Sequence, residues 1–216
     1  MISLYVDSAE RAEVEPLLRS GAFSGCTTNP KLLQRAGLTA VDLPDVYAWM
    51  VDAGAREVFL QTWGDDLDAM YAQAQRLLAI GDRVVIKVPA SAHGIAVAGR
   101  LHAAGAPVLL TAVYATHQAL TAGALGLEYV APYLGQLGDA GMDGRAMLGS
   151  MHRLLRATSS PTRVVAASLR STSDITWLAE HGIDAFAIPA SVAQRLFEDS
   201  HTAEAVRQFD AISAEW

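Results

Sequence analysis

The feature that most constrains the fold of this chain is a regular alternation of strand-forming and helix-forming segments. The segments predicted as strands are short, apolar and rich in β-branched residues: 2–6, 23–26, 57–61, 84–89, 107–112, 128–133, 162–167 and 184–188. The segments predicted as helices separate them: 9–19, 43–53, 65–80, 95–104, 117–123, 144–157, 174–181, 190–197 and 203–215. About eight strand–helix repeats in 216 residues predict an α/β fold, a single (β/α)8 TIM barrel.

Neither a linker nor a change in composition interrupts this alternation. We therefore expect one barrel domain over residues 1–216, with a C-terminal helix over about 203–216. The alternative is a doubly wound open sheet, which usually carries a glycine-rich phosphate-binding turn after a strand. The glycine-rich segment 134–143 lacks such a tight strand-to-helix turn, and we interpret it as a loop.

Composition argues against several classes of function. The net charge of −7 and the sequence pI of about 5.3 disfavour nucleic-acid and anionic-membrane partners, because proteins that bind them are generally basic. No apolar run approaches the roughly 20 residues of a membrane span, and the N-terminus lacks the layout of a signal peptide. The single cysteine, Cys26, cannot form an internal disulfide, which favours a reducing cytoplasm.

Two groups of residues could suggest a metal site, and neither has the pattern of one. Asp65, Asp66 and Asp68 open a predicted helix, where acidic residues cap the helix and complement its dipole. The six histidines show no paired ligand spacing. We therefore expect no metal site and disfavour a metal-dependent mechanism.

One predicted strand, Val84–Pro89, contains a lysine where apolar residues are usual. Its β-branched run is typical of a strand buried on both faces, whereas lysine is almost never fully buried unless it is paired or functional. One interpretation is an edge-strand lysine whose amine reaches water. The other is a Schiff-base lysine, which must be unprotonated to attack a ketone, so an apolar wall would lower its pKa from about 10.4 toward about 7.

Polar residues recur at the ends of the predicted strands. In barrels of this type the C-terminal ends of the strands carry the active site. The residues found there are Asp7, Thr27–Asn29, Gln61, Lys87, Thr111, Tyr133, Ser168 and Arg170. Each by itself could be a cap, a turn residue or a solvated strand end. Together they supply an amine, a carboxylate, a phenol and hydrogen-bond donors, which is what an imine-forming lyase requires.

Five segments resemble the transaldolase family, and more closely its small fructose-6-phosphate aldolase branch: Leu4–Asp7, Thr27–Pro30, Val85–Pro89, Thr111–Tyr114 and Tyr129–Tyr133. The similarity covers nearly the whole chain in order. It implies a (β/α)8 barrel, a class I mechanism with no metal or organic cofactor, and a small sugar or sugar-phosphate substrate. It also implies a ring-built homo-oligomer, a pentamer or a decamer of paired pentamers.

The resemblance also implies roles for the residues that match its motifs. Lys87 would form the Schiff base with the ketone donor, and Asp7 would be the nearby carboxylate that assists proton transfers. Thr27 and Asn29 would hold donor hydroxyls. Ala131, in the segment Tyr129–Tyr133, falls among the substrate-binding positions.

Three further matches concern carbon–carbon cleavage. Gln61, Thr111 and Tyr133 would position the water or proton that the reaction needs. True transaldolases of this family carry a glutamate and a phenylalanine at the positions of Gln61 and Tyr133. The two residues therefore favour an aldolase, with transaldolase as the alternative.

One position departs from the family pattern. Gln136 stands where the aldolases of the family have an arginine, which removes a cation that would bind phosphate. Ser168 and Arg170 match a second anion-binding segment of the family. We expect reversible aldol cleavage that yields dihydroxyacetone and an aldehyde. The alternatives within the family are a transaldolase, an aldolase for a non-phosphorylated or sulfonated sugar, and a non-catalytic sugar-binding relic.

Overall fold

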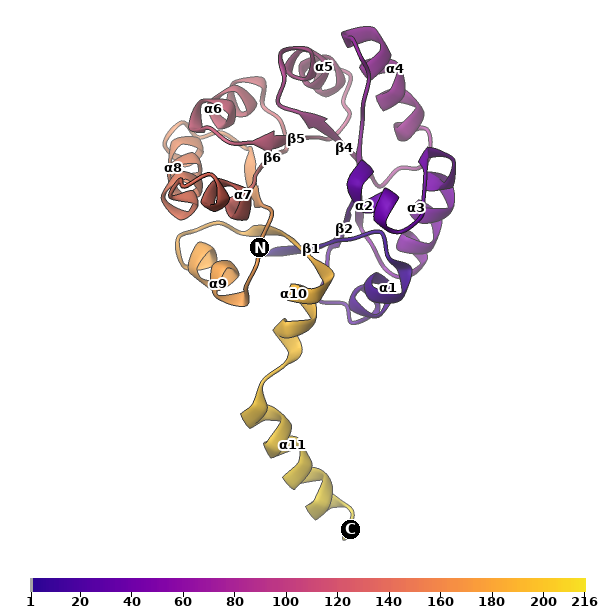
Figure 1. Cartoon of the computed structure of the whole chain (residues 1–216), viewed down its shortest axis with the longest axis vertical. Helices are drawn as coiled ribbons and strands as arrows, with labels where there is room; N and C mark the ends of the chain where they lie inside the picture. The colour runs from indigo at the N-terminus through magenta and orange to yellow at the C-terminus, as the bar shows by residue number, and fades with distance from the viewer. Residues whose placement is uncertain (1) are drawn as a thin grey trace.

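The computed structural model describes residues 2–216 and shows a closed barrel of parallel strands surrounded by helices (Figure 1). The strands are β1 (Ser3–Asp7), β2 (Gly25–Thr27), β3 (Glu57–Gln61), β4 (Val84–Pro89), β5 (Val108–Val113), β6 (Tyr129–Pro132), β7 (Arg163–Ala166) and β8 (Ala185–Ile188). Each strand pairs with the next in parallel, and β8 pairs with β1. The predicted (β/α)8 barrel is confirmed, and the open-sheet alternative is wrong.

All the helices except the last lie around the strands (Figure 1). They are α1 (Arg11–Arg19), α2 (Pro30–Arg35), α3 (Leu43–Asp52), α4 (Leu67–Leu78), α5 (Ala92–Ala103), α6 (Thr116–Leu125), α7 (Leu134–Asp139), α8 (Gly144–Ala157), α9 (Thr172–Glu180), α10 (Ala190–Gln194) and α11 (Ser200–Ser213), with 3-10 turns at Ala40–Asp42 and Arg195–Phe197. Asp66 is the N-cap of α4, and its carboxylate accepts a hydrogen bond from the Ala69 amide at 2.8 Å. The interpretation of Asp66 as a capping residue is therefore confirmed.

The strands divide their side chains between two cores, because successive residues of a strand point to opposite faces of the sheet. One set packs under the helices and includes Val6, Val58 and Ile86. The other set fills the barrel, and all its members have odd numbers: Tyr5, Phe59, Val85, Leu109, Tyr129, Ala131, Val165, Ala167, Ala185 and Ala187. Lys87 follows Val85 by two residues, so the same alternation directs its side chain into the barrel.

A polar cluster closes the barrel at the N-terminal ends of the strands. The Tyr5 and Tyr129 hydroxyls both donate to the Glu57 carboxylate, at 2.5 and 2.8 Å. The Arg163 guanidinium lies over the Tyr129 ring and donates to Asp184. We call Tyr5, Glu57, Tyr129 and Arg163 the floor cluster.

The segment 134–143 differs from its prediction as a loop, because residues Leu134–Asp139 form helix α7. Buried Leu134 and Leu137 anchor this helix. The Gly135 amide donates to the Ser168 carbonyl at 2.9 Å, and a Cβ at Gly135 would lie only 2.5 Å from that oxygen. A glycine that suggested a loop is thus needed for close contact between a helix and the chain after β7.

The last helix, α11, extends away from the barrel (Figure 1). None of its residues is buried, and three apolar side chains, Val206, Phe209 and Ile212, are 48%, 67% and 56% exposed. Across residues 2–216, no helix combines the length and the apolar character that a membrane span requires.

Candidate active site

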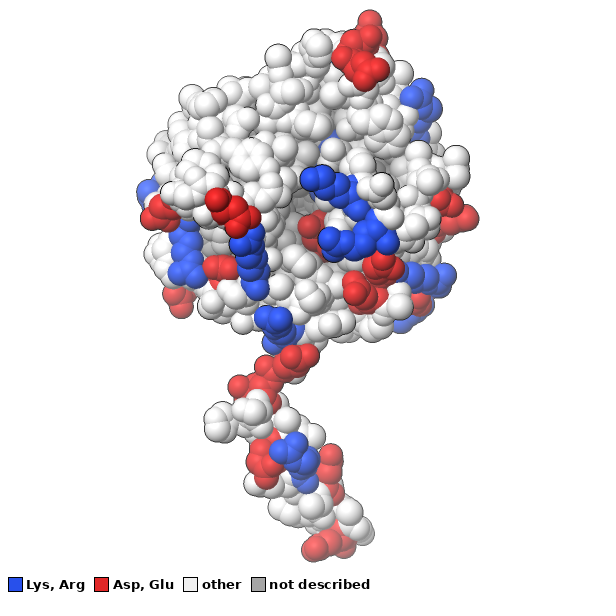
Figure 2. All heavy atoms as spheres, viewed as in Figure 1, with Lys and Arg blue, Asp and Glu red and all other residues white. Residues whose placement is uncertain are grey.

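A cavity of about 260 Å³ opens at the C-terminal ends of the strands, at the centre of the face shown in Figure 2. This is the end of the barrel at which enzymes of this fold place their catalytic residues. Most of the residues predicted for the site line the cavity: Asp7, Thr27, Asn29, Lys87, Ala131, Tyr133, Gln136, Ser168 and Arg170. The barrel therefore brings together side chains from β1, β2 and β4, from β6, and from the segments after β2, β6 and β7.

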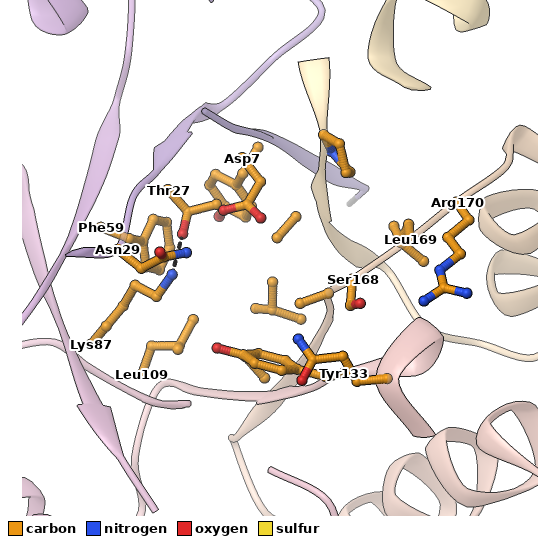
Figure 3. Close-up of a pocket in the computed structure, with 17 residues that line it drawn as sticks. Asp7, Thr27, Asn29, Phe59, Lys87, Leu109, Tyr133, Ser168, Leu169 and Arg170 are labelled. Atoms are coloured by element: carbon orange, nitrogen blue, oxygen red, sulfur yellow. Dashed lines mark hydrogen bonds between the residues drawn. The ribbon is translucent and has the colours of Figure 1, made fainter. Parts of the chain in front are cut away.

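Lys87 is the buried cation of this cavity, with only 5% of its surface exposed. Its Nζ donates to the Thr27 hydroxyl at 2.6 Å and to the Thr28 carbonyl at 2.8 Å (Figure 3). Burial lowers the pKa of Lys87, and the nearby Asp7 charge opposes that shift. A neutral amine keeps two N–H donors, which matches the two acceptors and leaves its lone pair for a nucleophilic step.

Asp7 ends β1 and faces the same space as Lys87 (Figure 3). Burial raises the pKa of its carboxyl, while the Lys87 charge and a hydrogen bond from the Thr27 hydroxyl oppose that rise. Asp7 and Thr27 are also register partners in the β1–β2 pair. The Thr27 hydroxyl therefore links the amine to the carboxyl and supplies a short route for a proton between them.

Tyr133 directs its phenol into the cavity (Figure 3). Its oxygen lies 2.8 Å from the hydroxyl of Thr111, which is fully buried beside it. Burial raises the pKa of Tyr133, so the phenol stays protonated at neutral pH. The pair forms a hydrogen-bonded donor on the wall of the cavity that faces Lys87.

Two predicted site residues, Gln61 and Thr111, do not line the cavity. Gln61 ends β3 in register with Lys87 and is partly buried. Thr111 lies within hydrogen-bond distance of Tyr133, which does line the cavity. Both lie beside residues that face the cavity.

The backbone is strained at two positions next to the site. Ala112 and Ser168 have φ values of 56° and 57°, in the left-handed region that residues with a Cβ rarely adopt. Ala112 lies where the β5–β6 register shifts, directly after Thr111, and Ser168 itself lines the cavity. Such strain tends to persist at functional sites, where the surrounding structure fixes it.

Sequence reasoning missed most of the apolar part of the cavity wall. The missed residues are the apolar Phe59, Leu109, Val165, Ala167, Leu169, Ala187 and Pro189, and the ring of Tyr5, whose hydroxyl belongs to the floor cluster. Polar side chains at strand ends are a signal for a site, whereas apolar residues within strands look like ordinary core. The period of two along each strand could have found most of them, since the inward positions of β1, β3, β5, β7 and β8 continue the odd-numbered series.

Solved structures share this barrel. A mandelate oxidase bound to 2-hydroxy-phenylacetamide superposes with a TM-score of 0.62 and 18% identity, over 89% of this chain and 66% of the oxidase. Thiamine phosphate pyrophosphorylase from Pyrococcus furiosus gives a TM-score of 0.60 and 18% identity, over 89% of this chain and 87% of that one. At these identities the likeness shows the fold alone.

Sequence comparison is more specific. A "Probable transaldolase" of Thermus thermophilus is 29% identical over 96% of both chains. A "Probable transaldolase" of Phenylobacterium zucineum is 27% identical over 96% of this chain and 94% of that one. The family model described as Transaldolase/Fructose-6-phosphate aldolase matches residues 4–216. Because this match spans nearly the whole chain, the chain belongs to the transaldolase/fructose-6-phosphate aldolase family.

Proposed function

We propose that this protein is a class I aldolase that reversibly cleaves a ketose or ketose phosphate to dihydroxyacetone and an aldehyde. The observation that carries the proposal is Lys87, an amine buried at the C-terminal end of the barrel with two hydrogen-bond acceptors and a carboxyl group beside it. Burial lowers the pKa of this amine and so favours its neutral, nucleophilic form.

Imine formation is the first step. The lone pair of Lys87 attacks the ketone carbon of the sugar, a C–N bond forms, and the carbonyl oxygen takes up a proton. That oxygen then leaves as water after a second protonation, so one water is lost for each iminium formed. Asp7 supplies and recovers protons through the Thr27 hydroxyl, which bonds to both groups.

Cleavage follows between the third and fourth carbons of the sugar. A base removes the proton of the hydroxyl on the fourth carbon, which becomes the aldehyde carbon, and the bonding electron pair moves into the iminium to give an enamine. Protonation of the third carbon and addition of water then release dihydroxyacetone and regenerate the amine. We assign the role of base to a water held at the protonated Tyr133 phenol, which Thr111 positions. That water takes the hydroxyl proton and returns a proton to the third carbon, and Gln61 would help to orient it.

Transaldolase is the second candidate, because the curated relatives carry that name. The two reactions share the imine and the enamine and differ in whether the enamine is hydrolysed or passed to a second aldehyde. Gln61 and Tyr133 favour hydrolysis, since true transaldolases of the family carry glutamate and phenylalanine there. Free dihydroxyacetone should therefore accumulate when no acceptor aldehyde is present. Trace release with fast three-carbon transfer would favour the transaldolase instead.

Reductive trapping tests the shared chemistry. Incubation with dihydroxyacetone and borohydride should add one donor mass to the peptide that contains Lys87, and the adduct should be absent from Lys87→Met. Lys31, the one other lysine of the chain, is the internal control. An adduct on Lys31, or none at all, would contradict the proposal, and the second result would favour a non-catalytic sugar-binding protein.

A further inference from the structure

The opening of the cavity is formed on one side by Gln136 of α7 and by Ser168 and Arg170 after β7. We call these three residues the rim. In the proposed reaction the aldehyde product leaves through this opening and, in the reverse direction, enters through it. The charge of the rim therefore bears on which aldehydes the enzyme accepts.

Gln136 presents a neutral group to the cavity, and a second residue fixes its orientation. The Tyr114 hydroxyl donates to Gln136 Oε1 at 2.5 Å, which leaves the amide N–H groups available to a ligand. The Tyr114 ring also packs edge-on against Tyr133, with ring centroids 5.6 Å apart. Tyr114 thus holds both the rim amide and the phenol of the cavity wall.

Arg170 contributes a positive charge to the rim, but this charge is already paired with a carboxylate. Its guanidinium donates to Asp139, at the end of α7. Figure 3 shows the guanidinium on the far side of Ser168 from Lys87. A phosphate at the rim would have to compete with Asp139 for this arginine and would be repelled by the same carboxylate.

Other cations border the opening without lining the cavity: basic side chains gather over α2 in Figure 2, and Arg35 lines a neighbouring hollow that shares Asp7 and Pro189 with the cavity. Among the described residues that line the cavity, Lys87 and Arg170 are the cations, and Lys87 lies at its base. Lys31 and Arg35 lie on α2, on the other side of the opening, and neither lines the cavity. In Figure 2 the surface over α5 and α6 is largely uncharged.

We propose that the acceptor of this enzyme is an uncharged aldehyde, selected by a rim whose charge Asp139 cancels and whose amide Tyr114 orients. The inference rests on the proposed function, because it assumes aldol chemistry at Lys87. Gln136 and Ser168 would donate hydrogen bonds to a terminal hydroxyl of the aldehyde. Asp139 and Tyr114 act as positioning residues through Arg170 and Gln136.

The ratio of kcat/KM for glyceraldehyde 3-phosphate to that for glyceraldehyde tests the charge argument, with dihydroxyacetone as donor. In the wild type this ratio should lie within about tenfold of unity, because Gln136 carries no charge and Asp139 already pairs with the Arg170 guanidinium. Gln136→Arg should raise it about 10- to 100-fold. Asp139→Asn should raise it about fivefold, the factor that an exposed ion pair contributes, and Asp139→Glu should restore the wild-type ratio.

Tyr114→Phe tests the orientation argument, since it removes the hydroxyl and keeps the ring packed on Tyr133. We expect KM for glyceraldehyde to rise about threefold to tenfold while kcat changes by less than about twofold, as loss of one neutral hydrogen bond predicts. Its effect should not add to that of Gln136→Ala, because both variants remove one interaction. Additive effects would overturn the role of Tyr114.

Borohydride trapping of dihydroxyacetone distinguishes failure of the proposed aldolase function from failure of the uncharged-acceptor proposal. If Lys87 forms no adduct, the proposed function fails, whatever the aldehyde ratios are. If Lys87 is trapped but the wild type prefers the phosphorylated aldehyde by more than about 100-fold, only the uncharged acceptor is overturned. A ratio that Gln136→Arg leaves unchanged overturns it as well.

Discussion

The interior of the barrel holds two polar clusters, one at each end of the strands, and their hydrogen bonds differ in kind. In the cavity, Lys87, Thr27 and Asp7 border empty space that a substrate can fill. In the floor cluster, both oxygens of Glu57 are occupied by buried or half-buried phenols. The same alternation of inward side chains builds both clusters, so their difference comes from residue chemistry and not from fold.

Two ionisable residues of the cavity, Lys87 and Asp7, lower the stability of the folded protein. Burial lowers the pKa of Lys87 and raises the pKa of Asp7, so each group is less stable in its charged form inside the barrel than in water. At neutral pH both shifts therefore cost folding free energy. The floor cluster contributes stability instead, because its phenols remain protonated donors to a carboxylate: burial, and then Glu57, raise the pKa of Tyr5.

The largest effect that this contrast predicts is on Lys87→Met. Activity should fall by about 10⁴-fold or more, as expected for loss of a covalent nucleophile. The melting temperature should stay the same or rise slightly, because the variant relieves the desolvation of the Lys87 charge, while Asp7 loses the opposite charge that offset its own burial. Steady-state cleavage and thermal denaturation measure the two. Lys31→Met, an exposed change, should alter neither, and a lower melting temperature in Lys87→Met would show that the lysine is structural.

Tyr133→Phe should have the next largest effect. We expect cleavage to slow by about 10²-fold if the phenol takes part in proton transfer, which corresponds to about 2.7 kcal/mol in the barrier. The buried Thr111 hydroxyl would lose its hydrogen-bond partner, so the free energy of unfolding should fall by about 1–3 kcal/mol. Single-turnover cleavage measures the chemical step. An unchanged rate would remove Tyr133 from the reaction and leave it as part of the cavity wall.

Much of the barrel follows from local sequence. The strands Glu57–Gln61 and Val84–Pro89 were predicted with their exact bounds, because β-branched runs between polar turns have few other interpretations. Strand ends also located the polar half of the cavity, since the fold gathers all eight C-terminal ends on one face. The family motif then supplied the role expected of Lys87, which spacing alone left open.

Other features depend on contacts between distant segments and could not be predicted in this way. The segment 134–143 contains the short helix α7 because buried Leu134 and Leu137 anchor it, although its glycines favour a loop. The pairs Tyr114–Gln136 and Asp139–Arg170 join residues 22 and 31 positions apart. No periodicity in the sequence indicates such pairings, because they depend on how α7 packs beside the segments that follow β5 and β7.

Glu57→Gln tests whether the floor cluster stabilises the fold. The amide keeps the size of the carboxylate but offers one acceptor oxygen in place of two, so either Tyr5 or Tyr129 loses its partner. We expect unfolding free energy to fall by about 1–3 kcal/mol, the cost of one unsatisfied buried polar group. Urea denaturation measures it. Borohydride trapping at Lys87 should be retained in the folded variant, and its loss would mean that the floor and the cavity are coupled.

The smallest effect concerns how pH changes the stability of wild type relative to Lys87→Met. Because burial lowers the pKa of Lys87, the unfolded chain holds this proton more tightly than the folded protein does. The resulting penalty is complete below the folded pKa, shrinks as pH rises from that value toward about 10.4, and vanishes above it, where the amine is neutral in both states.

We therefore expect Lys87→Met to have its greatest advantage near neutral pH and to lose it by about pH 10.5, with a slope of no more than about 1.4 kcal/mol per pH unit. Urea denaturation of both proteins across this range measures the difference. Lys31→Met should follow the wild type throughout, since its lysine is exposed. A constant advantage would show that the cost of Lys87 comes from its packing and not from its charge, and the two ends of the barrel would then differ only in how tightly they are filled.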